Sequence, residues 1–181
     1  RGDTKFMSVR FGNVLDSRGS VIPIFRERLK RREALEVTHP EMKRYLMITS
    51  EACLLVMAAG ALGEGGEVFA LDMGSPVKIV DLAYSMIRLS GLEPDKDIPV
   101  LFVGPRPGEK LFEEILTTEE GVVATKNEQI FRAKLSPIDQ DILKKGLSQF
   151  EEFVDSPEKE KCRDILQEIV PNYAPQLWNN S

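Results

Sequence analysis

The stretch Glu67-Val-Phe-Ala-Leu-Asp-Met-Gly-Ser-Pro-Val-Lys-Ile79 decides the fold class. Residues 67–72 form a short apolar run typical of a buried strand. The turn residues 74–76 follow, and they predict a helix that has a proline in its first turn and ends before Gly91. A strand, a turn and a helix in direct succession indicate an α/β protein.

The same alternation continues along the chain. Further strands are expected at residues 6–12, 34–38, 44–49, 97–103 and 128–133, and further helices at residues 22–32, 50–62, 137–154 and 157–170. Ser50 is expected to begin the second of these helices. A shift toward acidic composition separates a main part, residues 1–134, from a helical tail, residues 135–181, with a net charge of −4.

Composition excludes several classes of protein. The 181 residues are 42% apolar and 29% charged, with a net charge of −5, as in a folded globular chain. Two distant cysteines and one histidine form neither a disulfide framework nor a zinc site. The longest apolar stretch, residues 52–62, is shorter than the roughly 20 residues of a membrane span. The chain begins with Arg1, and its first residues do not have the order of a signal peptide, so we expect it to be part of a longer protein.

Four short segments place an Arg, an Asn or a carboxylate beside a Gly or Pro, at residues 10–14, 39–45, 71–77 and 104–110. Loops at strand ends are where α/β proteins hold ligands. The side chains of these segments suit a phosphorylated, hydroxyl-rich ligand.

The segment Gly104-Pro-Arg-Pro-Gly-Glu-Lys110 predicts a rigid turn on which Arg106 and Glu109 converge. A guanidinium donates two parallel hydrogen bonds to a phosphate, and a carboxylate accepts from both hydroxyls of a diol. The pair therefore predicts a site for a diphosphate and the adjacent ribose. The alternative is a surface ion pair between these two side chains.

Three other side chains have two interpretations each. Arg44 is either a second cation for the diphosphate or a strand-end arginine that faces solvent. Asn13 either donates its amide to a phosphate oxygen or caps the turn after Gly12. His39, before Pro40, is interpreted as a turn or packing residue.

A basic run, Arg26-Glu-Arg-Leu-Lys-Arg-Arg32, carries five cations. Such a run can contact nucleic acid or anionic lipid, but the chain is net acidic and no aromatic side chain is interleaved. We interpret the run as a solvated helix face and expect no nucleic-acid partner.

Five ordered segments carry a family pattern: Val9-Arg-Phe-Gly-Asn-Val-Leu15, Arg18-Gly-Ser-Val-Ile-Pro23, Val37-Thr-His-Pro-Glu-Met-Lys-Arg-Tyr45, Val68-Phe-Ala-Leu-Asp-Met-Gly-Ser-Pro-Val-Lys-Ile79 and Arg106-Pro-Gly-Glu-Lys-Leu-Phe-Glu-Glu114. Together they closely resemble CapD-like polysaccharide-biosynthesis proteins, which are nucleoside-diphosphate-sugar 4,6-dehydratases and epimerases of the extended short-chain dehydrogenase/reductase superfamily. The likeness covers residues 7–134 and 169–175. It implies the last strands and the substrate lobe of an NAD(P)-binding Rossmann-type domain in residues 1–134, followed by C-terminal helices.

The resemblance also implies roles for matching residues. The substrate-binding residues would be Asn13, Arg44, Arg106 and Glu109, and the residues on the nicotinamide side of the cofactor Phe11 and Gly12. Glu109 would hold the uridine ribose, and the other three substrate-binding residues the diphosphate. The sequence departs from the family at Asp16, usually Gly, at Leu46, usually Phe, and at Asn127, commonly His. A carboxylate at position 16 would weaken diphosphate binding if it pointed inward.

Catalysis in this superfamily needs a Gly-rich turn for the dinucleotide and a Tyr-x-x-x-Lys pair. The sequence contains neither, so we predict no catalytic residue and no metal site, and we expect this chain alone to bind no cofactor and to be inactive. The longer parent is expected to be an NAD(P)-dependent 4,6-dehydratase of a UDP-N-acetylhexosamine in capsular or other surface polysaccharide biosynthesis. The alternatives are a UDP-sugar 4-epimerase or reductase of the same superfamily, and a non-catalytic nucleotide-sugar binding module.

The expected partners are a UDP-sugar, the N-terminal Rossmann half of the parent and further copies in a homo-oligomer. We expect the protein in the cytoplasm, either free or held at the inner face of the membrane by an N-terminal region outside this chain. Without its neighbours, the strand at residues 6–11 would be an exposed edge prone to self-association.

Overall fold

The computed structural model describes residues 2–113, 121–135, 137, 139–153, 158–170 and 173. Parts of the expected pattern, including residues 114–120, 154, 157, 171–172 and 174–175, lie outside the described residues. The chain divides into two compact units, Arg1–Leu135 and Ser136–Ser181. In the described part of the chain, no helix is both long enough and apolar enough to cross a membrane.

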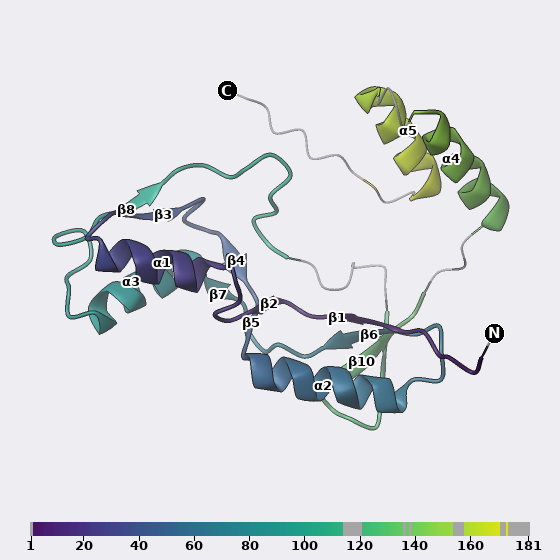
Figure 1. The fold of residues 1–181 in the computed structure, drawn as a ribbon, viewed down its shortest axis with the longest axis horizontal. Coiled ribbons are helices and arrows are strands. Elements are labelled where there is room, and N and C mark those ends of the chain that lie inside the picture. The colour runs from purple at the N-terminus through teal and green to yellow at the C-terminus, as the bar shows by residue number, and fades with distance from the viewer. Residues whose placement is uncertain are drawn as a thin grey trace. The chain divides into compact units, whose positions relative to one another are not determined.

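A four-stranded mixed sheet organises one half of the first unit (Figure 1). Its strands, in spatial order, are β1 (Ser8–Arg10), β6 (Val68–Leu71), β10 (Ile130–Ala133) and β9 (Val122–Ala124). β1 is parallel to β6, whereas β10 is antiparallel to both of its neighbours. β1 therefore forms one edge of the sheet, and its residues lead directly into the segment 10–14.

Helix α2 (Thr49–Leu62) packs on this sheet (Figure 1). Its buried residues Ala52, Leu55 and Ala59 form one stripe at helical spacing. They share a core with Phe69, Leu71 and Ile130 from the sheet. The helix begins at Thr49 rather than at Ser50, because the backbone is extended only as far as Ile48.

The other half of the first unit contains α1 (Val21–Lys30) and α3 (Ile79–Leu89) beside the parallel pair of β3 (Leu35–Val37) and β8 (Val100–Phe102). A second core joins these elements and includes Phe25, Leu35, Val37, Ile87 and Ile98, each no more than 1% exposed. This core fixes α1 against the β3–β8 pair. The loop that contains residues 103–109 begins where β8 ends.

Two short strand pairs connect the halves. β2 (Asn13–Val14) runs parallel to β5 (Leu46–Met47), and β4 (Lys43–Arg44) runs antiparallel to β7 (Val77–Lys78). The prediction of one strand at residues 44–49 is therefore wrong in detail, because the backbone on either side of Tyr45 pairs with different partners. The predicted helix start after residue 76 is also wrong: the two residues that follow the turn form β7, so α3 begins at Ile79.

The second unit is an α-hairpin of α4 (Gln140–Glu152) and α5 (Lys159–Ile169). α4 begins at Gln140 and not at Pro137, because the Asp139 carboxylate accepts hydrogen bonds from the main-chain N–H groups of Asp141 and Ile142 at 2.9 and 3.1 Å.

Candidate functional site

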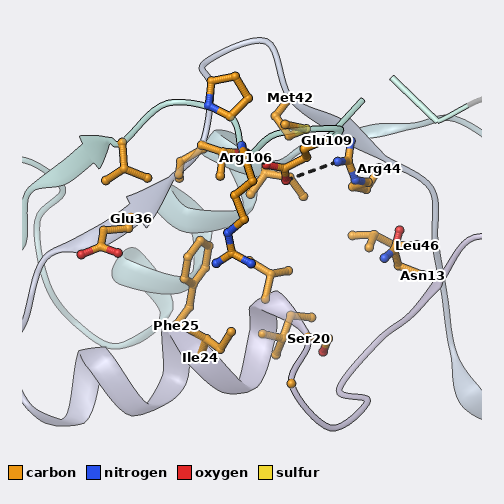
Figure 2. Close-up of a pocket in the computed structure, with 18 of the residues that line it drawn as sticks. Asn13, Ser20, Ile24, Phe25, Glu36, Met42, Arg44, Leu46, Arg106 and Glu109 are labelled. Carbon is orange, nitrogen blue, oxygen red and sulfur yellow. Dashed lines mark hydrogen bonds and ion pairs between the residues drawn. The ribbon is translucent and has the colours of Figure 1, made fainter. Parts of the chain in front are cut away.

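A cavity of about 980 Å³ opens in the first unit between α1 and the loop after β8 (Figure 2). Its lining residues come from five stretches of the chain: 13–15, 19–28, 36–46, 79 and 103–109. The volume is at the upper end of the range of about 300–1,000 Å³ that small-molecule sites occupy. We refer to it as the main cavity.

All four residues predicted to bind substrate line the main cavity: Asn13, Arg44, Arg106 and Glu109. In Figure 2, Arg106 reaches into this space from the loop above, and Glu109, Arg44 and Asn13 lie to its right. The predicted cofactor-side residues, Phe11 and Gly12, instead line a second cavity of about 540 Å³. Asn13 lines both cavities.

Arg44 is held inside the protein rather than facing solvent, because its side chain is only 13% exposed. Its Nη1 atom donates to the carbonyl oxygens of Lys43 and Leu111 at 2.8 and 3.3 Å. Its Nε atom lies 3.3 Å from Glu113 Oε1, and its Nη2 atom lies 3.6 Å from Glu109 Oε1. The solvent-facing interpretation of Arg44 is therefore wrong.

The Glu109 carboxylate closes the turn at residues 106–109. Its Oε2 atom accepts from the main-chain N–H of Arg106 at 3.0 Å, and the main-chain N–H of Glu109 donates to the Arg106 carbonyl at 2.9 Å. Gly108 within this turn has φ +79°, a conformation that favours glycine. The acid thus binds the backbone of Arg106 and leaves the guanidinium to other partners.

The Arg106 guanidinium points into the main cavity, toward Phe25 on α1 and Ser20, which precedes that helix (Figure 2). Within the described part of the chain, its side chain makes no hydrogen bond or ion pair. The surface ion pair between Arg106 and Glu109 is therefore not formed. A cation without an internal counterion can bind an anionic ligand without first breaking a salt bridge.

Sequence reasoning missed Glu113, which contacts two of the predicted residues. With the Asn13 amide oriented so that its nitrogen faces this carboxylate, Nδ2 donates to Glu113 Oε2 at 3.0 Å. The same carboxylate contacts Arg44 Nε. The only signal in the sequence was its place in the segment 106–114, next to the residues already chosen.

Gly12 is needed for a close approach of two chain segments. A Cβ atom at this position would lie 2.7 Å from the carbonyl oxygen of Tyr45 and 2.8 Å from the sulfur of Met73. The main-chain N–H of Gly12 also points at that sulfur. The glycine therefore lets β2 come close to the chain at Tyr45, and this contact positions the neighbouring Asn13.

The far end of the main cavity carries a second set of polar groups that sequence reasoning missed. Arg28 Nη2 lies 2.9 Å from Glu36 Oε2, and both residues line the cavity. Ser20 contributes a buried hydroxyl that has no hydrogen-bond partner among the described residues. Arg28 belongs to the basic run, of which Arg26, Lys30 and Arg31 also form ion pairs with acids of the chain.

Asp16 points away from the main cavity. Its carboxylate pairs with Arg26 at 2.9 Å, and it is not among the lining residues. Its φ of +60° explains why glycine suits this position, since that backbone conformation favours residues without a Cβ atom. His39 acts as a turn residue, because its Nδ1 accepts from the main-chain N–H of Glu41 at 3.1 Å.

Two carboxyl groups outside both cavities have a lowered pKa. The hydrogen bond and charge of Lys78 lower the pKa of the Glu41 carboxyl, and the main-chain N–H groups of residues 64–65 lower that of Glu67. Among the described residues, no cluster of His, Cys, Asp or Glu side chains could hold a metal ion. The main cavity presents guanidinium, amide and carboxylate groups, which suit the recognition of anions and hydroxyls.

Comparisons with known proteins agree on one family. Residues 1–135 match the family model described as polysaccharide biosynthesis protein. The chain is 56% identical over 132 residues to the capsular polysaccharide biosynthesis protein CapD of Staphylococcus aureus, covering 73% of this chain and 22% of that protein. It is 29% identical over 178 residues to a UDP-glucose 4-epimerase of Rickettsia bellii, covering 95% of this chain and 51% of the epimerase.

A solved structure is also similar to this chain. The X-ray structure of Pen from Bacillus thuringiensis superposes with a TM-score of 0.63 at 34% identity, covering 76% of this chain and 42% of that one. The chain thus spans between about a fifth and a half of the length of these relatives. Since the family model covers three quarters of the sequence, the chain belongs to the polysaccharide biosynthesis protein family.

Proposed function

We propose that this chain is the nucleotide-sugar-binding part of a nucleoside-diphosphate-sugar 4,6-dehydratase and that it binds a UDP-N-acetylhexosamine in the main cavity. One observation carries the proposal: Asn13, Arg44, Arg106 and Glu109, from separate segments, line a single cavity. Two guanidinium groups beside one carboxylate match a diphosphate joined to a ribose.

Each residue has a distinct part in this proposal. Arg106 enters the cavity, and its side chain has no partner among the described residues, so its fork is open to the diphosphate. Arg44 would present its Nη2 edge to the same group, since its other nitrogens are held by the protein. Glu109 retains lone pairs beyond those used by Arg106 N–H, and these would accept from the ribose hydroxyls.

The complete reaction belongs to a longer protein. There, NAD(P) would supply the chemistry of hydride removal at sugar C4 and hydride return at C6 that brackets the loss of water. The residues of this chain that fit its nicotinamide side are Phe11 and Gly12, which line the second cavity beside the main one. We propose that the longer protein works in the cytoplasm as a homo-oligomer in surface polysaccharide biosynthesis.

Calorimetric titration of this chain with UDP, UDP-N-acetylglucosamine and uridine tests the proposal. UDP and the UDP-sugar should bind saturably, and uridine, which lacks the diphosphate, should bind more weakly. Amide chemical shifts should change at residues 13, 44 and 106–109 and stay constant in α4. Absence of saturable UDP binding, or shift changes confined to surfaces outside the main cavity, would exclude a UDP-sugar site here.

Product analysis separates the candidate activities. A dehydratase lowers the mass of the sugar nucleotide by one water, whereas a 4-epimerase, suggested by the named Rickettsia relative, leaves the mass unchanged. The assay needs a longer protein that contains this chain, because no Tyr-x-x-x-Lys pair occurs in the sequence. UDP-sugar binding without any turnover by that longer protein would favour the non-catalytic module.

A further inference from the structure

Glu113 occupies the boundary between the two cavities. It lines the second cavity together with Asn13, which lines both. Its carboxylate accepts from Asn13 Nδ2 at 3.0 Å through Oε2 and lies 3.3 Å from Arg44 Nε through Oε1. One carboxylate therefore contacts two of the groups that the proposed function assigns to the diphosphate.

The contacts of Arg44 show which edge of its guanidinium is left for a ligand. Nε faces Glu113, and Nη1 donates to the carbonyls of Lys43 and Leu111. Among the described residues, the ion-pair partner of Nη2 is Glu109 Oε1 at 3.6 Å, which is beyond hydrogen-bond distance. With the Nε and Nη1 sides fixed, the planar group can turn only by breaking these contacts, so Nη2 keeps one direction.

We propose that Glu113 is a positioning residue, whose carboxylate fixes the Asn13 amide and the Nε edge of Arg44 so that both groups are set for the anionic ligand of the main cavity. This inference rests on the proposed function, since it needs a ligand with a diphosphate. Glu113 itself does not contact that ligand. Its carboxylate adds a negative charge near an anion site. The proposal can therefore be tested by whether removal of that charge raises or lowers the affinity for the diphosphate.

Electrostatics and positioning predict opposite results for Glu113→Gln. Removing a carboxylate from the surroundings of an anion site strengthens anion binding if charge alone matters. In glutamine an NH₂ group replaces one of the two carboxylate oxygens, so a donor is turned toward a position where Asn13 or Arg44 also presents a donor, and the negative charge that holds both groups is lost. If positioning matters, the variant therefore binds the diphosphate more weakly despite its more favourable charge.

The experiment compares the unaltered chain, Glu113→Gln, Glu113→Asp and the control Glu41→Gln. Glu41 is an exposed carboxylate paired with Lys78 at 2.9 Å and lines neither cavity, so its variant removes the same charge elsewhere. UDP affinity is measured by calorimetry. The side-chain resonances of Asn13 NH₂ and Arg44 Nε–H are measured by NMR without ligand, where a charge-assisted hydrogen bond shifts and protects them.

We expect Glu113→Gln to weaken UDP binding about tenfold, in line with the loss of a hydrogen bond to a charged group, and to move both resonances. Glu41→Gln should change neither. Glu113→Asp keeps the charge and both acceptor atoms, so it should restore part of the affinity. Unchanged or tighter UDP binding in Glu113→Gln, or resonances that do not move, would overturn the inference.

The two arms separate this inference from the proposed function. If the unaltered chain fails to bind UDP, the proposed function falls, and the NMR arm still decides whether Glu113 holds Asn13 and Arg44. If UDP binds but the Asn13 NH₂ and Arg44 Nε–H resonances do not move in Glu113→Gln, the proposed function stands and the positioning role is wrong.

Discussion

The Nη2 atom of Arg44 lies 3.6 Å from Oε1 of Glu109, so a cation on β4 and an acid from the loop after β8 face each other in one wall of the main cavity. A nucleoside diphosphate carries its negative charge and its ribose hydroxyls on adjacent groups. The spacing of these two side chains therefore suits a ligand in which an anion and a diol are neighbours.

Arg106→Ala should weaken UDP binding by about 1.5–3 kcal/mol, the range for hydrogen bonds to charged groups. The thermal midpoint of the chain should hardly change, because this side chain has no intramolecular partner among the described residues. Calorimetry and thermal unfolding measure the two effects. Arg31→Ala is a matched control, since Arg31 pairs with Glu27 outside the main cavity. Equal UDP affinity in the Arg106 and Arg31 variants would remove Arg106 from the site.

Arg44→Ala should lower both UDP affinity and stability. The change removes donors to the carbonyls of Lys43 and Leu111 and leaves the Glu113 carboxylate without its cation. Loss of the two hydrogen bonds alone is expected to cost about 1–3 kcal/mol of unfolding free energy. Urea titration measures the stability. A variant that loses UDP affinity with no loss of stability would show that these internal contacts are not formed in solution.

Glu109→Gln should weaken UDP binding by about 1 kcal/mol, because an amide accepts from a diol less well than a carboxylate does. The loss should be smaller for 2′-deoxy-UDP, which offers one hydroxyl fewer. Glutamine can still accept from the Arg106 N–H, so the turn at residues 106–109 is expected to persist. Equal losses for the two nucleotides would argue against a ribose contact.

Gly12→Ala should destabilise the first unit by about 1–3 kcal/mol, the usual cost of overpacking. The added Cβ atom would lie 2.7 Å from the Tyr45 carbonyl oxygen, and a main-chain atom cannot move aside as a side chain does. Gly60→Ala is the control, because the Cβ atom there meets nothing within 4 Å and alanine favours the α2 helix. That variant should be neutral or slightly more stable. Similar stabilities of the two variants would contradict the close approach at Gly12.

Glu67→Gln should remove part of the acid sensitivity of the fold. The main-chain N–H groups of Glu64 and Gly65 donate to this carboxylate at 2.8 Å each, and they hold its pKa below the ordinary value of 4.5. A carboxyl group whose pKa is lower in the folded than in the unfolded state stabilises the fold at pH values above its unfolded pKa. This contribution is lost as the pH falls through the folded pKa. The free energy of unfolding, measured from pH 7 to 3, should therefore fall less steeply below about pH 4.5 in the variant than in the unaltered chain.

The control for this pH series is Glu64→Gln, which removes a carboxylate from the same turn and none of these hydrogen bonds. Its pH profile should follow that of the unaltered chain. If Glu67→Gln kept the full acid sensitivity, the turn between α2 and β6 would not contribute to it.

Long periodic elements could be predicted from the sequence, whereas short strand pairs could not. The helices α1, α2 and α3 follow apolar spacing along one segment, so local pattern suffices to find them. The two-residue strands of the pairs β2–β5 and β4–β7 carry no pattern of their own. Their pairing depends on segments far apart in the chain, which also explains the two wrong boundaries near Tyr45 and Ile79.

The candidate site divides in the same way. Arg44, Arg106, Glu109 and Asn13 could be chosen because each stands beside a Gly or Pro or in a family motif, and they share one cavity. Glu36 carries no such mark, and Glu113 carries only its place in the segment 106–114. Their importance comes from their contacts with Arg28, Asn13 and Arg44. Pairings of this kind depend on tertiary structure and leave no trace in local spacing.

Asn13 belongs to the walls of both cavities. Molecules seated in the two spaces would consequently meet at this one residue. A substitution at position 13 would then alter the surroundings of both molecules at once.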